Sequence, residues 1–255
     1  MRENLAKQRL AAGETVVTLS VNLPSAALVE LLALLGPDLI TVDTEHSTIG
    51  LETFEEMVRA ADVAGVPLIA RIGENEPQNT LRYLDAGAAG VQITMVSTPA
   101  EAERAVASAK YPPLGRRGLA PTRAARYGLR GPLADYVAAA NRETLVVVQI
   151  ETPEGVENAA AIAAVEGLDV VMVGPTDLAS AMGHLGDPNH PSVRAATERV
   201  LTAVRQADKA AGNLARDLAD CQALREQGYR YLYVSSTALL TKSVATLLAE
   251  VRRAG

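Results

Sequence analysis

The sequence predicts an α/β protein with the (β/α)8 barrel fold, and three observations support this expectation. Short β-branched apolar runs alternate with Ala- and Leu-rich segments of helical period along the chain. Most of the apolar runs are continuous, which is typical of parallel strands that are covered on both faces. The length of 255 residues suits one barrel of this kind. We therefore expect a single domain over residues 1–255.

The expected elements follow one another along the chain as strand-then-helix units. Strands are expected at residues 16–21, 39–44, 68–72, 90–94, 145–150, 170–173 and 231–234, with a doubtful eighth at 213–215. Helices are expected at residues 24–35, 51–64, 77–86, 98–109, 153–164, 192–211, 218–227 and 238–253. An early proline marks the start of two helices, after Thr98 and Thr152. The irregular segment 111–131 is rich in Gly, Pro and Arg, and its length predicts a functional role.

The main competing fold is an open doubly wound sheet. Its nucleotide-binding fingerprint, G-x-G-x-x-G, is absent after the first expected strand, which runs into Asn22-Leu23-Pro24 instead. The hydrophobic fraction of 48% and the charged fraction of 21% are ordinary for a globular chain and exclude a disordered or fibrous one. The barrel therefore remains the expected fold.

Composition also narrows the partners and the compartment. No apolar run approaches the roughly 18 residues that a membrane span requires, so we expect no membrane partner. The net charge is −6 and no basic block occurs, which argues against a nucleic-acid surface. The single cysteine, Cys221, and an amphipathic start that contains acids predict a cytoplasmic protein without a targeting segment.

Reactive side chains gather where the expected strands end. In barrels of this class the chemistry lies at the carboxyl ends of the strands. The second strand ends in residues 43–46 (DTEH) and the third in Arg71, whereas the fifth ends in Gln149 and Glu151 and the sixth in residues 174–177 (GPTD). These ends would all face one mouth, so they predict the functional site.

Two carboxylates at neighbouring strand ends predict a metal site. Glu151 and Asp177 supply oxygen ligands, which suit a divalent ion such as Mg²⁺, Mn²⁺ or Co²⁺ whose sphere is completed by water and substrate. The alternative is structural, with Asp177 capping the next helix and Glu151 pairing with an arginine.

Gly174 and Pro175 open a short helix, so backbone N–H groups near Thr176 and Asp177 could bind a carboxylate. An ordinary strand-to-helix turn is the alternative here.

The remaining mouth residues suggest acid–base chemistry. His46 follows Asp43 by three positions and could be a general base that a carboxylate orients. Arg71 would place a positive charge where an enolate oxygen develops, unless it only pairs with Glu45 or Glu74. Gln149 shares the inward face with Glu151, so it is expected to contact substrate or metal-bound water.

Several motifs in their order resemble one family. DTEH, the R-x-x-x-N-x-P of residues 71–77, LDAGAAGVQITMV, YPPLGRRG, QIET and VGPTDL make the chain similar to the class II, metal-dependent pyruvate aldolases. This is the family of 4-hydroxy-2-oxoheptanedioate and 2-dehydro-3-deoxyglucarate aldolases. The resemblance runs from about residue 5 to residue 212, and more loosely to the end.

The resemblance implies a reaction and an assignment of roles. The protein would cleave 4-hydroxy-2-oxo acids reversibly to pyruvate and an aldehyde through a pyruvate enolate. Glu151 and Asp177 would bind the metal, Gln149 and the turn of Gly174, Pro175 and Thr176 would hold pyruvate, Arg71 would stabilise the enolate, and His46 would be the base, with Asp43 and Asp85 orienting it. The resemblance also implies a homo-hexamer, a trimer of dimers that exchange their last helix, here about residues 237–253.

Two positions depart from the family pattern, and two other functions remain open. Thr94 stands where the family often has proline, and VSSTALL after the last strand lacks the usual Gly-x-Asp. An acyl-CoA lyase of the same superfamily would use a related metal site, with arginines of segment 111–131 binding the CoA phosphates. The third possibility is a non-catalytic barrel that serves as a binding module.

Overall fold

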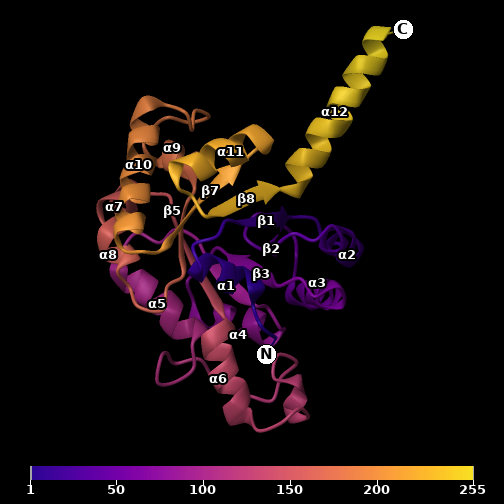
Figure 1. Cartoon of the computed structure of the whole chain (residues 1–255), viewed down its shortest axis with the longest axis vertical. Helices are drawn as coiled ribbons and strands as arrows, with labels where there is room; N and C mark the ends of the chain where they lie inside the picture. Colours follow the sequence, from indigo (N-terminus) through magenta and orange to yellow (C-terminus); the bar gives the residue numbers. More distant parts are fainter. Residues whose placement is uncertain (1, 255) are drawn as a thin grey trace.

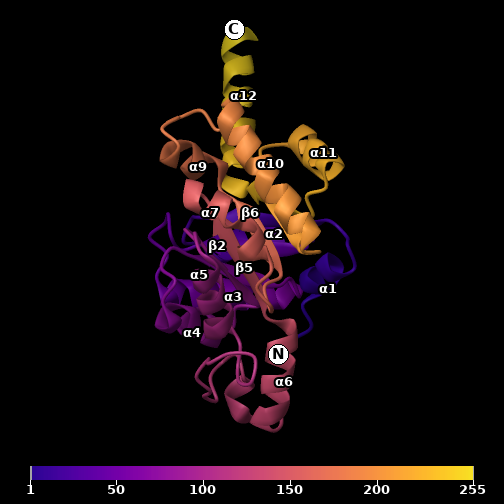
Figure 2. The same ribbon diagram turned by 90° about the vertical axis from the view of Figure 1, so that its left-hand side faces the viewer.

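The computed structural model describes residues 2–254 and shows a closed barrel of parallel strands (Figures 1 and 2). Each strand pairs with the next, and the last pairs with the first. The strands are β1 (Val16–Val21), β2 (Leu39–Asp43), β3 (Leu68–Ile72), β4 (Gly90–Ile93), β5 (Leu145–Ile150), β6 (Val170–Val173), β7 (Ala210–Ala215) and β8 (Tyr231–Ser235). The predicted (β/α)8 fold is confirmed.

The helices lie outside the strands and connect them. They are α1 (Leu5–Ala11), α2 (Ala26–Leu34), α3 (Leu51–Ala64), α4 (Pro77–Asp85), α5 (Pro99–Ala109), α6 (Leu133–Glu143), α7 (Pro153–Glu157), α8 (Ala159–Ala163), α9 (Pro175–Ala181), α10 (Pro191–Gln206), α11 (Leu218–Gln227) and α12 (Ser236–Ala254). The two start signals seen in the sequence are real: Thr98 forms a capping box with Glu101, and the Thr152 hydroxyl accepts from the Gly155 N–H.

Three expected elements differ from the structure. The helix expected at 192–211 ends at Gln206, and the doubtful strand is a full strand, β7, from Ala210. The helix expected at 153–164 is divided at Asn158, which ends α7 and precedes α8. Helix α6 was not expected at all.

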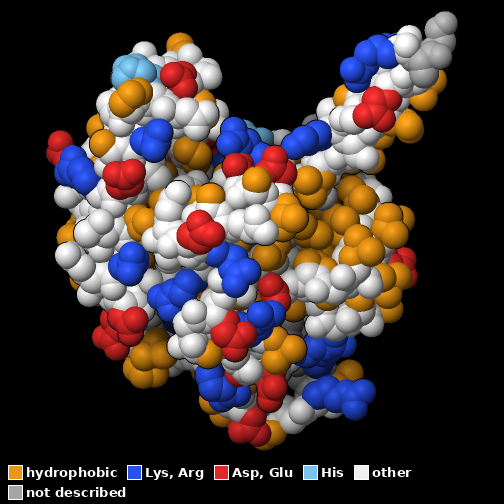
Figure 3. All heavy atoms as spheres, turned by 45° about the horizontal axis from the view of Figure 1, so that its top comes forward, with side chains coloured by type: hydrophobic (Ala, Val, Ile, Leu, Met, Phe, Trp, Pro, Cys, Tyr) orange, Lys and Arg blue, Asp and Glu red, His pale blue; other side chains and the backbone are white. Residues whose placement is uncertain are grey.

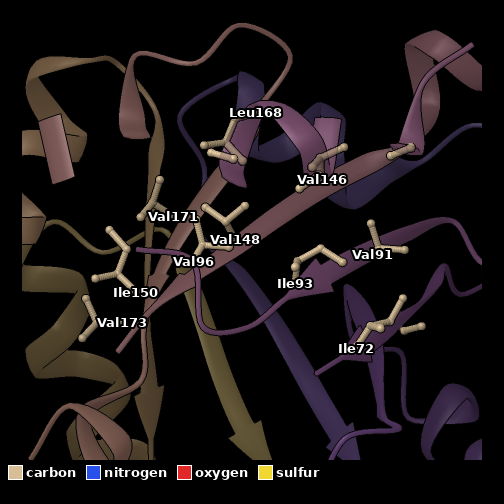
Figure 4. Close-up of a cluster of buried hydrophobic side chains, with 14 of the residues drawn as sticks. Ile72, Val91, Ile93, Val96, Val146, Val148, Ile150, Leu168, Val171 and Val173 are labelled. Atoms are coloured by element: carbon tan, nitrogen blue, oxygen red, sulfur yellow. The ribbon is translucent and has the colours of Figure 1, made fainter. Parts of the chain in front are cut away.

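The apolar core has two layers, one on each side of the barrel wall. Outward-facing side chains of the strands pack against the surrounding helices, and Figure 4 shows part of this layer around β4, β5 and β6, with Val91, Val148 and Val171 among its residues. Inside the barrel lies a smaller apolar cluster, to which α1 contributes Ala6 and Leu10. The members of this cluster are Ala6, Leu10, Val16, Leu39, Ile69, Leu145, Val147, Val170, Met172, Ala210, Tyr231 and Tyr233. Helix α1 therefore closes the amino-terminal end of the barrel.

A polar network lies at this closed end. The ammonium groups of Lys7 and Lys110 both donate to the Thr144 carbonyl, at 2.9 and 2.7 Å. Lys7 also donates to Asp169, and Lys110 also donates to the Asn141 carbonyl. Lys110 is buried, and this burial, together with the neighbouring charge of Lys7, lowers its pKa to about 7.

The last helix leaves the body of the molecule. Helix α12 begins directly after β8 and projects away from the barrel, at the opposite end of the molecule from α6 (Figure 1). Its apolar side chains are exposed (Leu239, Leu240, Val244, Leu247, Leu248, Val251), and hydrophobic side chains also gather on the surface below it (Figure 3). Within residues 2–254 no helix is long and apolar enough to cross a membrane.

Candidate active site

The strand ends bring most of the expected residues to one mouth. In the register of the barrel Asp43 on β2 lies beside Arg71 on β3, and Arg71 lies beside Gln92 on β4. Gln149 lies on β5, and Glu151 follows that strand directly. All of these side chains are buried, so the mouth holds a concentration of polar groups that the apolar strands position.

Arg71 is held between two carboxylates. Its Nη1 lies 3.0 Å from Oδ2 of Asp43, and its Nη2 lies 2.7 Å from Oε2 of Glu45. Burial alone would lower the pKa of Arg71, but the interactions with the Tyr233 phenol and then with the carboxylates of Asp43 and Glu45 outweigh it and raise the pKa. The guanidinium therefore stays charged. The pairing with Glu45 that was considered as a structural alternative does exist.

The loop after β2 carries His46. The backbone N–H groups of Glu45 and His46 both donate to Oδ1 of Asp43, at 3.1 and 3.0 Å, so Asp43 fixes the turn. The imidazole itself is exposed, and its Nε2 lies 3.6 Å from Oε2 of Glu45. Asp43 thus orients His46 through the backbone, whereas the carboxylate beside the ring is that of Glu45.

Glu151 is buried and its two oxygens are both used. Oε1 accepts from the Met95 backbone N–H at 2.7 Å, and Oε2 accepts from the Gln149 amide at 2.6 Å. Met95 has a φ of 56°, an uncommon left-handed conformation for its residue type, at the position where its N–H meets Glu151. Burial raises the pKa of Glu151, and the negative charge of Asp177 raises it further, while the two hydrogen bonds oppose this rise. Asp177 is therefore close enough to repel Glu151.

The turn after β6 completes this side of the mouth. Gly174 is buried, and a Cβ atom there would overlap Oε2 of Glu151 and Nε2 of Gln149, so the position needs glycine for space. Pro175 begins α9, and the exposed Thr176 and Asp177 lie in its first turn. Gly174 is thus placed against Glu151 and Gln149, and the other three residues of the expected turn follow it in α9.

Residues that the sequence analysis missed connect the two sides inside the barrel. The Gln92 amide donates to Oε1 of Gln149 at 2.7 Å, and the Tyr231 hydroxyl donates to Oε1 of Gln92 at 3.3 Å. Thr41 continues the chain from Tyr231, at 3.3 Å. Gln92 and Thr41 are polar residues in otherwise apolar strands, which was the available signal. This chain of bonds sets which way the Gln149 amide faces Glu151.

Asp85 does not lie at the mouth of its own chain. It ends α4, before β4 begins, and therefore lies at the closed end of the barrel. Its carboxylate pairs with Arg117 at 2.7 Å, and Arg117 is also stacked on the Tyr111 ring. The contacts within one chain thus bring Asp43, Arg71 and His46 together and leave Asp85 apart from them.

The donors at the mouth fit a hard divalent cation. Across the described chain no three His, Cys, Asp or Glu side chains are grouped so that they could hold a metal by themselves. Glu151 and Asp177 supply two carboxylates that repel each other, and a cation would relieve this repulsion. Mg²⁺ and similar ions often use one or two protein carboxylates and take their other ligands from water and substrate.

Comparison with known proteins identifies the family. A family model described as HpcH/HpaI aldolase/citrate lyase matches residues 17–242. The 5-keto-4-deoxy-D-glucarate aldolase of Shigella boydii is 36% identical over 247 residues, which cover 97% of this chain and 95% of that protein.

Solved structures agree with this comparison. A crystal structure of an HpcH/HpaI aldolase/citrate lyase family protein from Burkholderia cenocepacia is 38% identical with a TM-score of 0.92, and it covers 98% of this chain and 99% of its own. An HpcH/HpaI aldolase from Desulfitobacterium hafniense is 31% identical with a TM-score of 0.90, covering 96% of both chains. The chain is thus an aldolase, a carbon–carbon lyase, and it belongs to the HpcH/HpaI aldolase/citrate lyase family.

Proposed function

We propose that this aldolase cleaves 4-hydroxy-2-oxo acids reversibly to pyruvate and an aldehyde, with a divalent metal ion bound at Glu151 and Asp177. The observation that carries the proposal is the joint placement of a buried carboxylate, a fixed guanidinium and an exposed imidazole at one mouth. The Shigella boydii relative is named for a sugar-acid substrate. A 4-hydroxy-2-oxo acid with further hydroxyl groups is therefore the first substrate to test.

The two carboxylates would hold the metal, and neighbouring groups would orient the Glu151 carboxylate. When bound, it would supply a Lewis acid that polarises the keto oxygen of the substrate. Gln149 and the Met95 N–H hold the Glu151 carboxylate in one orientation, which is the usual role of groups that surround a metal ligand. Mg²⁺, Mn²⁺ and Co²⁺ all accept oxygen ligands, so each is a candidate.

The protein's own groups account for binding and proton transfer. The backbone N–H groups of Thr176 and Asp177, in the turn that Gly174 and Pro175 open, would bind the carboxylate of pyruvate, together with the Gln149 amide. Arg71 would face the oxygen on which negative charge develops as the enolate forms. His46 would take the proton from the hydroxyl of the substrate in cleavage, and from the pyruvate methyl group in the reverse direction.

The acyl-CoA alternative loses its supporting observation. Segment 111–131 lies between α5 and α6, at the closed end of the barrel and away from the mouth. Two of its arginines are already paired, Arg117 with Asp85 and Arg123 with Asp62. These two arginines therefore do not line the mouth of their own chain, where an acyl-CoA would have to be cleaved.

The proposed assembly is a homo-oligomer that exchanges α12, and we expect a hexamer built from dimers. Six exposed apolar residues on α12 mark a surface for contact with another protein chain. Exposed Leu31 and Leu34 on α2, with Leu35 directly after it, offer an apolar surface on another copy. Exchange of a terminal element between identical chains is a common route to a dimer.

Activity with and without metal tests the proposed function. We expect pyruvate release from a 4-hydroxy-2-oxo acid to stop after EDTA treatment and to return with Mg²⁺, Mn²⁺ or Co²⁺, while malyl-CoA is not cleaved. Binding of Mn²⁺, followed by electron paramagnetic resonance of the free ion, should be lost in Glu151→Ala and Asp177→Ala and retained in Glu157→Ala, an exposed glutamate on α7. Full activity without metal, or unchanged Mn²⁺ binding by the two variants, would contradict the proposal.

A further inference from the structure

The Glu45 carboxylate lies close to three other side chains of the mouth, those of Thr94, Arg71 and His46. Its Oε1 accepts a hydrogen bond from the Thr94 hydroxyl at 2.8 Å. Its Oε2 lies 2.7 Å from Nη2 of Arg71 and 3.6 Å from Nε2 of His46. One oxygen therefore faces both the cation and the imidazole of the site, while the other is fixed by a neutral hydroxyl.

The neighbouring backbone makes room for Glu45 in this position. A Cβ atom on Gly73 would lie 2.9 Å from Cγ and 3.1 Å from Oε1 of Glu45. Because the carboxylate is held at both oxygens, the side chain could not move aside without losing one of these contacts. Gly73, directly after β3, thus leaves room for the side chain of Glu45.

We propose that Glu45 is a positioning residue that orients Arg71 and His46 relative to each other, and that the Thr94 hydroxyl holds the Glu45 carboxylate in place for this task. This inference rests on the proposed function, in which Arg71 and His46 act on the substrate. The Arg71 guanidinium and the Glu45 carboxylate form a short ion pair of 2.7 Å, so the position of Oε2 limits where the guanidinium can lie.

Thr94 is needed because the last torsion of a glutamate side chain is soft. The carboxylate of Glu rotates in a broad, roughly two-fold potential, so Arg71 alone would not fix its plane. The bond from Thr94 to Oε1 fixes this plane and leaves Oε2 directed at both Arg71 and His46. Thr94 is itself buried, so water does not readily replace its hydroxyl.

The arrangement also balances charge during the reaction. When His46 takes a proton, the imidazolium that forms lies beside Oε2 of Glu45. Asp43 is engaged with Nη1 of Arg71 and with two backbone N–H groups, so it holds the loop while Glu45 faces the ring. Glu45 therefore serves the base and the enolate-stabilising cation at the same time.

The test compares Thr94→Val, Thr94→Ser, Glu45→Gln and the control Glu74→Gln, which removes a carboxylate from the exposed loop after β3. Each metal-loaded enzyme is assayed for kcat and KM and for exchange of the pyruvate methyl protons with D₂O, which needs the base but no aldehyde. Because small misplacements at a site can cost about 10²-fold, we expect Glu45→Gln to lose roughly that factor in kcat and exchange, and Thr94→Val about 10-fold. KM should change little, Thr94→Ser should restore the rate, and Glu74→Gln should match the wild type.

The outcomes separate this inference from the proposed function. Wild-type kcat and exchange in both Thr94→Val and Glu45→Gln would overturn the role of Glu45, while the function would stand. A rise in KM at unchanged kcat would also overturn it, because that pattern reports ground-state binding. If Thr94→Val does not fold, judged by circular dichroism, the isosteric Glu45→Gln decides. Failure of the wild type to release pyruvate would instead refute the proposed function.

Discussion

Arg71 differs from an ordinary ion-paired arginine because it is buried and two of its nitrogens hold two different carboxylates. We expect Arg71→Ala to lower kcat by about 10²-fold or more, the scale that follows loss of a donor to a developing oxyanion. The deletion also leaves Asp43 and Glu45 without their cation, so thermal stability should fall too. Arg71→Lys keeps the charge and should recover stability more than kcat. Arg59→Ala, on the exposed face of α3, is the matched control, and an Arg71→Ala enzyme within about fivefold of wild type would make Arg71 a structural residue.

His46 is exposed, so a substrate that arrives from solvent can reach its imidazole. General-base catalysis contributes about 10²–10⁴-fold, so His46→Ala should lose activity on that scale and still bind Mn²⁺. Exchange of the pyruvate methyl protons in D₂O isolates this step, and we expect it only with metal present and with His46 intact. Should His46→Ala exchange as fast as the wild type, a different group removes the proton.

Most of the site residues that the sequence predicted end strands or follow them, and Asp85, at the end of α4, is the exception. Asp43, Arg71 and Glu151 could be found because a barrel places all strand ends at one mouth. Glu45 was considered only as a pair for Arg71, because sequence spacing does not show which carboxylate of a turn faces the imidazole. Gln92 lies within a strand, so its place in the hydrogen-bond chain depends on the closure of the barrel.

At the scale of elements, the strands with branched apolar residues were predicted well, and β7 was not. Its sequence, AAGNLA, has weak strand propensity and continues the Ala-rich pattern of α10. The barrel interior explains this composition, since a Cβ on Gly212 would lie 2.9 Å from the Tyr231 ring. Helix α6 was missed because it follows a long irregular segment and begins after Pro132 without a side-chain cap.

The elements at the closed end, α1, α5 and α6, meet at Lys110, and their packing should depend on pH. Its pKa falls from 10.5 in the unfolded chain to about 7 in the fold, so between these values only the unfolded chain binds the proton. Stability should therefore rise as the pH increases from 7 toward 10, and the contribution is lost as the pH falls toward 7. Lys110→Met should flatten this part of the pH dependence of Tm, whereas Lys209→Met should not. An equal slope in wild type and Lys110→Met would contradict the assignment.

For the whole molecule, the projecting α12 is the element through which we expect copies of the chain to assemble. Leu247 and Leu248 are 59% and 46% exposed in a single chain, so replacing both with Glu should cost an isolated monomer little. If α12 packs on another copy, the same charges would be buried and the assembly should dissociate. We expect light scattering to show a smaller species for the double variant, while Leu185→Glu, at a still more exposed leucine in the loop before α10, keeps the wild-type mass. An unchanged mass for the double variant would place the contacts between copies elsewhere.

If Asp85 acts on the His46 of another copy, activity should depend on the assembly of the chains. Its carboxylate lies at the closed end of its own barrel, paired with Arg117, so it can orient His46 only if the His46 belongs to another copy. We therefore expect His46→Ala and Asp85→Ala to be weakly active alone and to regain activity when the two chains are unfolded together and reassembled. With random mixing of equal amounts, roughly a quarter of the sites would combine an intact His46 with an intact Asp85. Mixing the same proteins without reassembly is the control. If reassembly restores nothing although each variant forms the wild-type oligomer, Asp85 has no part in the site, and its bond to Arg117 is structural.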